Sequence, residues 1–302
     1  MNTKVLVVGD VMTDIIVRPE GPLVLGSDRR ARIESKPGGS GANQAVWLGA
    51  SGVAVKFAAR VGAAQKREHE ARFLRQGVTP VLVGDPMLAS GTLVTLVDPN
   101  GERSFLTDRG ANLNLSAEDL GDHLLDGVGL VVISGYSFFA PGPRAAVQSL
   151  IERARARDVA LAIDPASTGF LAEVGPRNFL DWVGTADWLF ANESEAQLLT
   201  GEADSERQMR QLGEQFGQVV IKRGALGASC GGAAGIAISR PAPQVRVVDS
   251  TGAGDAFAAG FIAGLMGKAD LETCLERGVA NGARAVQHVG GQPQGETAVI
   301  SP

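Results

Sequence analysis

Residues suited to phosphoryl chemistry occur together in the stretch 248–260, which reads V-D-S-T-G-A-G-D-A-F-A-A-G. It joins an alternating, strand-like run at Val245 and Val247 to a helix of small residues. Backbone N–H groups of Gly252–Gly254 can lie at the N-terminus of this helix, which attracts anions because its first amides lack intrahelical partners. Asp255 adds a carboxylate that can take a proton from an attacking hydroxyl. A glycine-rich turn with an ordinary helix-starting acid is the alternative.

Polar residues also follow the first predicted strand, where open α/β sheets bind ligands. The apolar run Lys4–Gly9 is typical of a buried parallel strand, and Asp14 follows it before a second apolar run, Ile15–Val17. Next, P-G-G-S-G-A-N-Q-A (37–45) leads into a helix, where glycines allow close backbone approach and Asn43 offers a donor and an acceptor. A turn acid and a glycine-rich helix start are the alternatives.

Further polar residues at the ends of later predicted strands are candidate site residues. Asn192 is a natural cap for a helix whose first turn contains Glu193 and Glu195. These acids either stabilise the helix start or order a Mg²⁺–phosphate complex, usually through water. Lys222 can approach a phosphate tail or remain a solvated charge, and Tyr136 can line a substrate pocket or pack in the core.

The elements that position these residues alternate between strands and helices. Predicted strands cover Lys4–Gly9, Val53–Ala59, Val78–Val83, Leu130–Ser134, Val159–Asp164, Trp188–Ala191 and Val219–Lys222. Predicted helices cover Gln65–Gln76, Pro143–Arg157 and Leu271–Val286. This alternation predicts a mostly parallel sheet with helices on both faces.

Two segments interrupt the alternation. Residues 19–36 form a polar flap, and Gly91–Val97 with Glu102–Thr107, joined by D-P-N-G, are typical of a β-hairpin. Together they predict a small β-sheet lid, formed by about residues 13–37 and 88–110 and inserted into a single domain that spans residues 1–302. Exposed strand edges and an apolar face would let two copies pair, so we expect a homodimer through the lids.

Composition argues against several classes of protein. The 302 residues include 28 Lys or Arg and 33 Asp or Glu, a net charge of −5 without a basic run, which disfavours nucleic-acid and anionic-membrane partners. The chain shows no signal-like start and no long apolar run, so we expect a cytoplasmic protein. Neither its two distant cysteines nor its three histidines have metal-ligand or triad spacing, and no Walker A pattern occurs.

Four motifs occur in one order along the chain: P-G-G-S-G-A-N, N-x-x-E at Asn192–Glu195, K-R-G-A-L-G-A, and D-S-T-G-A-G-D-A-F. Together they resemble the PfkB/ribokinase family of carbohydrate kinases over nearly the whole chain. The resemblance implies a ribokinase-like three-layer α/β/α sandwich with a β-sheet lid. It also implies transfer of the γ-phosphoryl group of ATP to a hydroxyl of a sugar or sugar-like molecule, with Mg²⁺ as cofactor.

The resemblance assigns roles to individual residues. The implied catalytic residues are the base Asp255 and the anion-hole residues Gly252, Ala253 and Gly254. The predicted substrate contacts are Asp14, Gly38, Gly39, Asn43, Tyr136 and Arg109. The predicted nucleotide contacts are Asn192, Glu195 (also near Mg²⁺, through water), Lys222, Gly224, Gly227, Asn281 and Ala285. Asp249 and Thr251 fall where some members bind a monovalent cation such as K⁺.

Four positions depart from ribokinases proper. Met12 replaces a polar sugar contact, no acid stands near Tyr136, Ser40 replaces a lysine, and residues 62–65 lack an acid usual in the family. These departures leave the phosphoryl-transfer residues intact and argue against ribose itself. Met12 and Tyr136 give the pocket an apolar side, which suits a nucleoside or a different sugar.

Three alternatives to a sugar kinase stay open. The first is a nucleoside kinase of the same family. The second is a non-catalytic sugar- or nucleotide-binding protein on this fold, which would predict an eroded base or anion hole. The third, a kinase for hydroxymethyl groups on pyridoxal-like or pyrimidine rings, is disfavoured by the lid segments and by Asp14 with Gly39 and Asn43.

Overall fold

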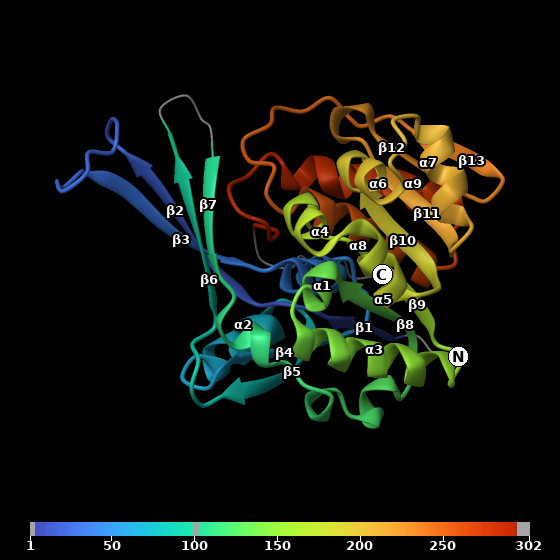
Figure 1. Ribbon diagram of the computed structural model, residues 1–302, viewed down its shortest axis with the longest axis horizontal. Coiled ribbons are helices and arrows are strands. Elements are labelled where there is room, and N and C mark those ends of the chain that lie inside the picture. The colour runs from blue at the N-terminus through green and yellow to red at the C-terminus, as the bar shows by residue number, and fades with distance from the viewer. Residues whose placement is uncertain (1–3, 99–102, 295–302) are drawn as a thin grey trace.

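A nine-stranded sheet forms the centre of the computed structural model, which describes residues 4–98 and 103–294 (Figure 1). The strand order is β13-β12-β11-β10-β9-β8-β1-β4-β5, and all pairs from β5 to β11 are parallel. Only β12 and β13 run antiparallel to their neighbours. The strands are β1 (Lys4–Val8), β4 (Val55–Gly62), β5 (Val78–Asp85), β8 (Val128–Ser134), β9 (Ala160–Asp164), β10 (Ala186–Asn192), β11 (Phe216–Lys222), β12 (Ala228–Gly232) and β13 (Gly235–Arg240).

Helices cover both faces of this sheet and bury two separate cores. One face carries α1 (Ser40–Ala50), α2 (Lys66–Arg75), α8 (Ala253–Met266) and α9 (Leu271–Ala285). The other carries α3 (Pro141–Arg155), α4 (Thr168–Val174), α5 (Pro176–Val183), α6 (Glu193–Thr200) and α7 (Ser205–Gly213). Because side chains alternate along a strand, Val5 and Val7 of β1 enter the first core while Leu6 and Val8 enter the second. The predicted three-layer α/β/α architecture is confirmed.

A second sheet of four strands, here called the lid sheet, projects from the body at the left of Figure 1. It has the order β3-β2-β6-β7, in which β2 and β6 are parallel and the outer pairs are antiparallel. Its strands are β2 (Met12–Pro19), β3 (Ala31–Gly38), β6 (Gly91–Val97) and β7 (Arg103–Asp108). The predicted flap and hairpin therefore pair with each other, although the hairpin turn at 99–102 lies outside the described residues.

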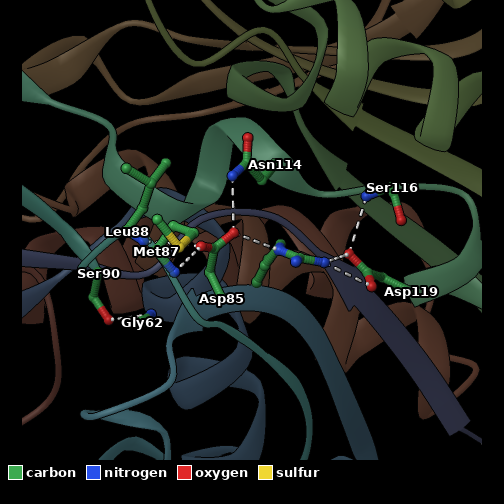
Figure 2. A network of polar contacts seen from close by, with 9 residues as sticks. Gly62, Asp85, Met87, Leu88, Ser90, Asn114, Ser116 and Asp119 are labelled. Carbon is green, nitrogen blue, oxygen red and sulfur yellow. Dashed lines mark hydrogen bonds and ion pairs between the residues drawn. The ribbon is translucent and has the colours of Figure 1, made fainter.

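Asp85, at the end of β5, ties together the chain segments that enter and leave the lid sheet. Its Oδ1 accepts the N–H groups of Met87 and Leu88, both at 2.9 Å. Its Oδ2 accepts Asn114 Nδ2 at 2.8 Å and Arg60 Nε at 3.0 Å (Figure 2). The bonds from Asn114, Leu88 and Met87 hold the pKa of Asp85 well below its usual range, so the carboxylate stays ionised.

Asn112 makes a second tie at the base of the lid sheet. Its Oδ1 accepts the N–H of Val11 at 2.9 Å, and its Nδ2 donates to the carbonyls of Val11 at 3.0 Å and Arg109 at 2.8 Å. The side chain thus pairs with the backbone that leads into β2 much as a neighbouring strand would. This anchoring role was not visible in the sequence, because the partners lie about a hundred positions apart in the chain.

One predicted element is wrong. The alternating run at Val245 and Val247 forms no strand, since residues 241–252 belong to neither sheet. Pro241 and Pro243 lack the N–H needed to extend a ladder beyond β13. The N–H of Val248 instead donates to the carbonyl of Val286 after α9, at 2.7 Å.

Among the described residues, no helix has the length and apolar character needed to cross a membrane.

Candidate active site

Polar residues gather where the parallel strands end. The chain fills the sheet from β1 towards β5 and then resumes on the other side of β1 at β8, so the strand order reverses beside β1. Open α/β sheets bind ligands at such a reversal, outside the carboxyl ends of the strands. A cavity of about 1050 Å³ opens there, and its lining includes Asp10 after β1, Tyr136 after β8, Asp164 of β9, Asn192 of β10 and Lys222 of β11.

The cavity brings together most of the site residues predicted from the sequence. Those in its lining are Asp14, Gly39, Asn43, Arg109, Tyr136, Asn192, Glu195, Lys222, Gly224, Gly227, Thr251, Gly252, Ala253, Gly254 and Asp255. Such a volume lies at the upper end of the range for ligand pockets.

Four predicted residues lie outside the lining. On α9, Asn281 and Ala285 point elsewhere, and the cavity is lined instead by Val279, Gly282, Ala283 and Val286. These four positions follow the three-to-four-residue spacing of one helix face, whereas Ala285 is buried in the core. Gly38 and Asp249 lie behind the lining. Gly38 still shapes the site, because a Cβ at that position would overlap the carboxylate of Asp14.

Asp255 is buried in the first turn of α8, where three donors from the N-terminal part of α1 reach its carboxylate. Oδ1 accepts Ser40 Oγ at 2.7 Å and Gln44 Nε2 at 3.3 Å. Oδ2 accepts Asn43 Nδ2 at 2.9 Å. Burial, and then the charge of Asp164, raise the pKa of Asp255 to about 7, against the opposing effect of these hydrogen bonds. The carboxylate can therefore gain and lose a proton near neutral pH.

Unpaired backbone N–H groups lie beside this carboxylate. Gly252 caps α8 with φ of 72°, in the left-handed region that glycine adopts without strain. The N–H groups of Gly254 and Asp255 make no hydrogen bond within the described residues. Amides at a helix N-terminus favour an anion, so this turn has the chemistry of an anion hole.

Buried charges line the cavity next to the anion hole. Lys222 Nζ lies 2.9 Å from Asp164 Oδ2, with side chains only 11% and 6% exposed. Burial by itself would lower the pKa of Lys222, but the carboxylates of Asp164 and Glu195 outweigh it and raise this pKa. Asn192 and Glu195 form a reciprocal capping box at the start of α6, with both bonds at 2.8 Å. Lys222 therefore remains a cation in the cavity.

The opposite part of the cavity has buried acceptors without donors. Asp14 is 6% exposed and lies within β2 of the lid sheet, not in the loop after β1 that the sequence suggested. Asp14 Oδ1 and Asn43 Oδ1 are buried without a hydrogen-bond partner. Burial, followed by the charges of Asp10 and Asp249, raises the pKa of Asp14 to about 7. Buried acceptors without donors cost free energy, so a ligand with hydroxyl groups would be stabilised here.

An apolar wall borders these acceptors. Met12 and Phe105 line the cavity from the lid sheet, and Tyr136 and Phe170 line it from the body. The rings of Tyr136 and Phe170 meet edge to face, with centroids 5.8 Å apart. Arg109 lies over the Tyr136 ring at 4.9 Å and donates to the Tyr136 carbonyl at 3.3 Å. Burial raises the pKa of Tyr136 to about 12, so the phenol keeps its proton.

Several lining residues were not predicted as site residues. Asp10 and Asp164 each stand at the end of a parallel strand, and the rule that selected Asn192 and Lys222 would have found them. Ala166, two residues beyond Asp164, has φ of 73°, a conformation uncommon outside glycine that often marks functional sites. No sequence signal was available for Ala166.

Asp249 and Thr251, which were predicted to bind a monovalent cation, are hydrogen-bonded to each other in the loop that leads to Gly252. Asp249 Oδ1 accepts the N–H of Thr251 at 2.9 Å, and Oδ2 accepts the N–H of Gly290 at 3.0 Å. In the described part of the chain, no group of three or more His, Cys, Asp or Glu side chains is arranged to hold a metal ion.

Comparison with known proteins gives the same architecture. A solved structure described as ribokinase II from E. coli, in complex with ATP and Mg²⁺, has a TM-score of 0.85 and 25% identity, and the match covers 95% of this chain and 94% of that one. An ATP-dependent ribose-1-phosphate kinase of Halopiger xanaduensis is 29% identical over 291 residues, or 93% of this chain and 90% of that protein. A fructokinase of Klebsiella pneumoniae is 29% identical over 279 residues, or 88% and 85%.

The profile of the pfkB family carbohydrate kinases matches residues 2–298, nearly the whole chain. Its match includes both sheets, every helix described above and all the residues that line the cavity. The ribokinase-like fold and the resemblance seen in the motifs are both confirmed. This chain belongs to the pfkB family of carbohydrate kinases.

Proposed function

We propose that this kinase transfers the γ-phosphoryl group of ATP to a hydroxyl of a sugar or sugar-like molecule, with Asp255 as general base. One observation carries the proposal: the buried Asp255 carboxylate lines the same cavity as unpaired helix N–H groups and buried acceptors that lack donors. The first feature suits a phosphoryl group and the second suits a polyhydroxylated acceptor.

The residues present can divide the work of phosphoryl transfer. Asp255 takes the proton from the attacking hydroxyl, and a pKa of about 7 suits a base at neutral pH. Gly252, Ala253 and Gly254 orient the N–H groups that stabilise charge on the transferring oxygens. Asp14 and Asn43 accept hydrogen bonds from other hydroxyls and so align the acceptor.

The part of the cavity lined by Lys222, Gly282 and Ala283, here called the nucleotide half, would hold ATP. Lys222 supplies a buried positive charge for the phosphates, while Gly282 and Ala283 of α9 offer a small, flat surface to the base. Glu195 would hold Mg²⁺ through water, and this ion would neutralise phosphate charge. Asp249 and Thr251 would hold the loop that precedes the proposed anion hole, and this loop would also bind K⁺.

The apolar wall favours a second candidate, a nucleoside kinase. Met12, Phe105 and Tyr136 give the acceptor half a surface that a simple sugar would leave uncovered. A nucleoside would place its ribose against Asp14 and its base against this wall. The two candidates differ in whether the preferred acceptor carries an aromatic base.

The lid sheet has two proposed roles. It would close over the acceptor and exclude water, which competes as a phosphoryl acceptor. It would also pair with the lid sheet of a second copy, since Ile33 and Leu106 are each more than half exposed. A monomer by light scattering at micromolar concentration would contradict the homodimer.

We place this kinase in the cytoplasm, where ATP is available.

A thermal-shift screen of sugars and nucleosides, with a non-hydrolysable ATP analogue present, tests the proposed function. A true acceptor raises the unfolding midpoint through mass action, without a prior assumption about the chemistry. Each hit is then assayed for ADP formation with ATP and Mg²⁺. Binding of sugars without any turnover would support the non-catalytic alternative and contradict the proposal.

Asp14→Asn should stabilise the unliganded protein at pH 8 while weakening acceptor binding. The folded-state pKa of Asp14, about 7, exceeds its ordinary value of 3.8. The folded state therefore binds more protons than the unfolded state between about pH 4 and 7, and stability falls as the pH rises through this window. Removing the charge should add up to about 4 kcal/mol at pH 8, while the KM for the acceptor should rise at least about tenfold.

Urea unfolding at several pH values checks the first effect, and steady-state kinetics check the second. The gain in stability should shrink as the pH is lowered towards 4, because Asp14 is then protonated, and so uncharged, in the folded wild-type protein as well. A gain that is independent of pH would show that the charge of Asp14 is not its source.

A further inference from the structure

Ser40 is the first residue of α1, and its hydroxyl donates to Oδ1 of Asp255 at 2.7 Å. We infer that Ser40 is a positioning residue that anchors Oδ1 of Asp255 and leaves Oδ2 as the oxygen that receives the proton. Because Ser40 acts on the base of the proposed reaction, this role rests on the proposed function.

The distribution of donors distinguishes the two oxygens of Asp255. A carboxylate has about four acceptor sites, two on each oxygen. Oδ1 uses both of its sites, for Ser40 Oγ at 2.7 Å and Gln44 Nε2 at 3.3 Å. Oδ2 uses one, for Asn43 Nδ2 at 2.9 Å. Only Oδ2 keeps a free site for the hydroxyl of an acceptor.

The positions of the donors agree with this division. Ser40 and Asn43 line the cavity, whereas Gln44 is fully buried behind them. Oδ1 is thus fixed both from the cavity side and from the core. Without Ser40, the remaining contact to Oδ1 would be the 3.3 Å bond from Gln44, and the carboxylate could turn about its Cβ–Cγ bond.

The bond from Ser40 also favours the ionised form of Asp255. Two other charged groups act on this carboxylate: Asp164 of β9 raises its pKa and Lys222 of β11 lowers it. Tyr136, which follows β8, keeps its proton and is neutral. A hydroxyl that donates to an ionised oxygen lowers the proton affinity of that oxygen. Ser40 supplies this effect without adding a positive charge to the acceptor half.

Ser40→Ala should therefore move the acid limb of the kcat/KM profile to higher pH by about one unit. At pH 7 the ionised fraction of Asp255, and with it kcat/KM, should fall about fivefold. At pH 9 the activity should be within about twofold of wild type, because the base is then ionised in both. A loss of packing alone would lower the maximum value of kcat/KM at high pH and leave the acid limb at the same pH.

Two variants control this experiment. Ser40→Thr keeps the hydroxyl and should restore the wild-type profile. Ser51→Ala removes the serine at the other end of α1, whose hydroxyl donates to the Trp47 carbonyl at 2.8 Å, and should leave the acid limb unmoved. An acid limb that is the same in Ser40→Ala and wild type, or a shift of equal size in Ser51→Ala, would overturn the role of Ser40.

A carbon-detected NMR titration of Asp-labelled protein measures the same property without turnover. The resonance of Asp255, assigned by its loss in Asp255→Asn, should titrate at higher pH in Ser40→Ala than in wild type. A shifted titration in a protein that phosphorylates no acceptor would overturn the proposed function and support the contact of Ser40 with Asp255. An active enzyme with an unshifted titration would overturn the role of Ser40 alone.

Discussion

Asp255→Asn is expected to lower kcat by about 10²–10⁴-fold, the usual contribution of a general base. The amide keeps the shape of the carboxylate, and its oxygen can still accept a hydrogen bond from Asn43 or from Ser40 and Gln44. It cannot take the proton of an attacking hydroxyl. ATP affinity should change little, because the proposed phosphate contacts are backbone N–H groups and Lys222. Coupled measurement of ADP formation gives kcat, and calorimetric titration gives the affinity for ATP.

Stability provides an internal check on this variant. Because burial raises the pKa of Asp255, the ionised carboxylate costs folding free energy at neutral pH, and its removal should not destabilise the protein. Asp158→Asn is the matched control, since Asp158 is an exposed turn residue with φ of 52°, which asparagine tolerates. Asp158→Asn should keep full activity. Wild-type turnover by Asp255→Asn would exclude Asp255 as the base.

Gly252→Ala is expected to have the second largest effect, a fall in kcat of about 10²–10³-fold, comparable to the loss of an oxyanion-hole donor. A methyl group at Gly252 would lie 2.5 Å from the Cα of Gly291, so backbone must move on one side or the other. The turn that orients the N–H groups of Gly254 and Asp255 would shift with it. The left-handed φ of 72° adds a cost of about 1–2 kcal/mol for alanine.

Gly201→Ala is the control that separates the backbone strain of alanine at a left-handed φ from the displacement of the neighbouring backbone. Gly201 ends α6 with φ of 76°, and a methyl group there would meet nothing within 4 Å. Both variants should lose stability in chemical unfolding, but only Gly252→Ala should lose kcat. If Gly252→Ala kept its turnover while losing as much stability as Gly201→Ala, the helix N-terminus would not act on the transferring group.

Local features of the fold were predictable because they depend on neighbouring residues. The buried strands were found because apolar runs such as Val5–Val8 need no distant information. The start of α6 was found because Asn192 and Glu195 lie three residues apart. The same local pattern failed at Val245 and Val247, where two prolines and the carbonyl of Val286 decide the backbone pairing.

The supports of the lid sheet were not predictable from local pattern. Asp85 binds Asn114 across 29 positions, and Asn112 binds Val11 across 101. Each of these side chains would be an ordinary polar residue in any loop. Their role arises only because the strands bring four chain connections to one place at the base of the lid sheet.

The sequence by itself identified the kinase family, because its motifs are local, and the proposed anion hole and its carboxylate come from four consecutive residues, Gly252 to Asp255. Only the tertiary structure decided how that carboxylate is held and what faces it. Ser40 reaches Asp255 across 215 positions, and Lys222 reaches Asp164 across 58. The physical reason is that hydrogen bonding within a turn is set by neighbouring residues. Contacts between chain segments depend instead on strand order and helix packing, which local spacing does not encode.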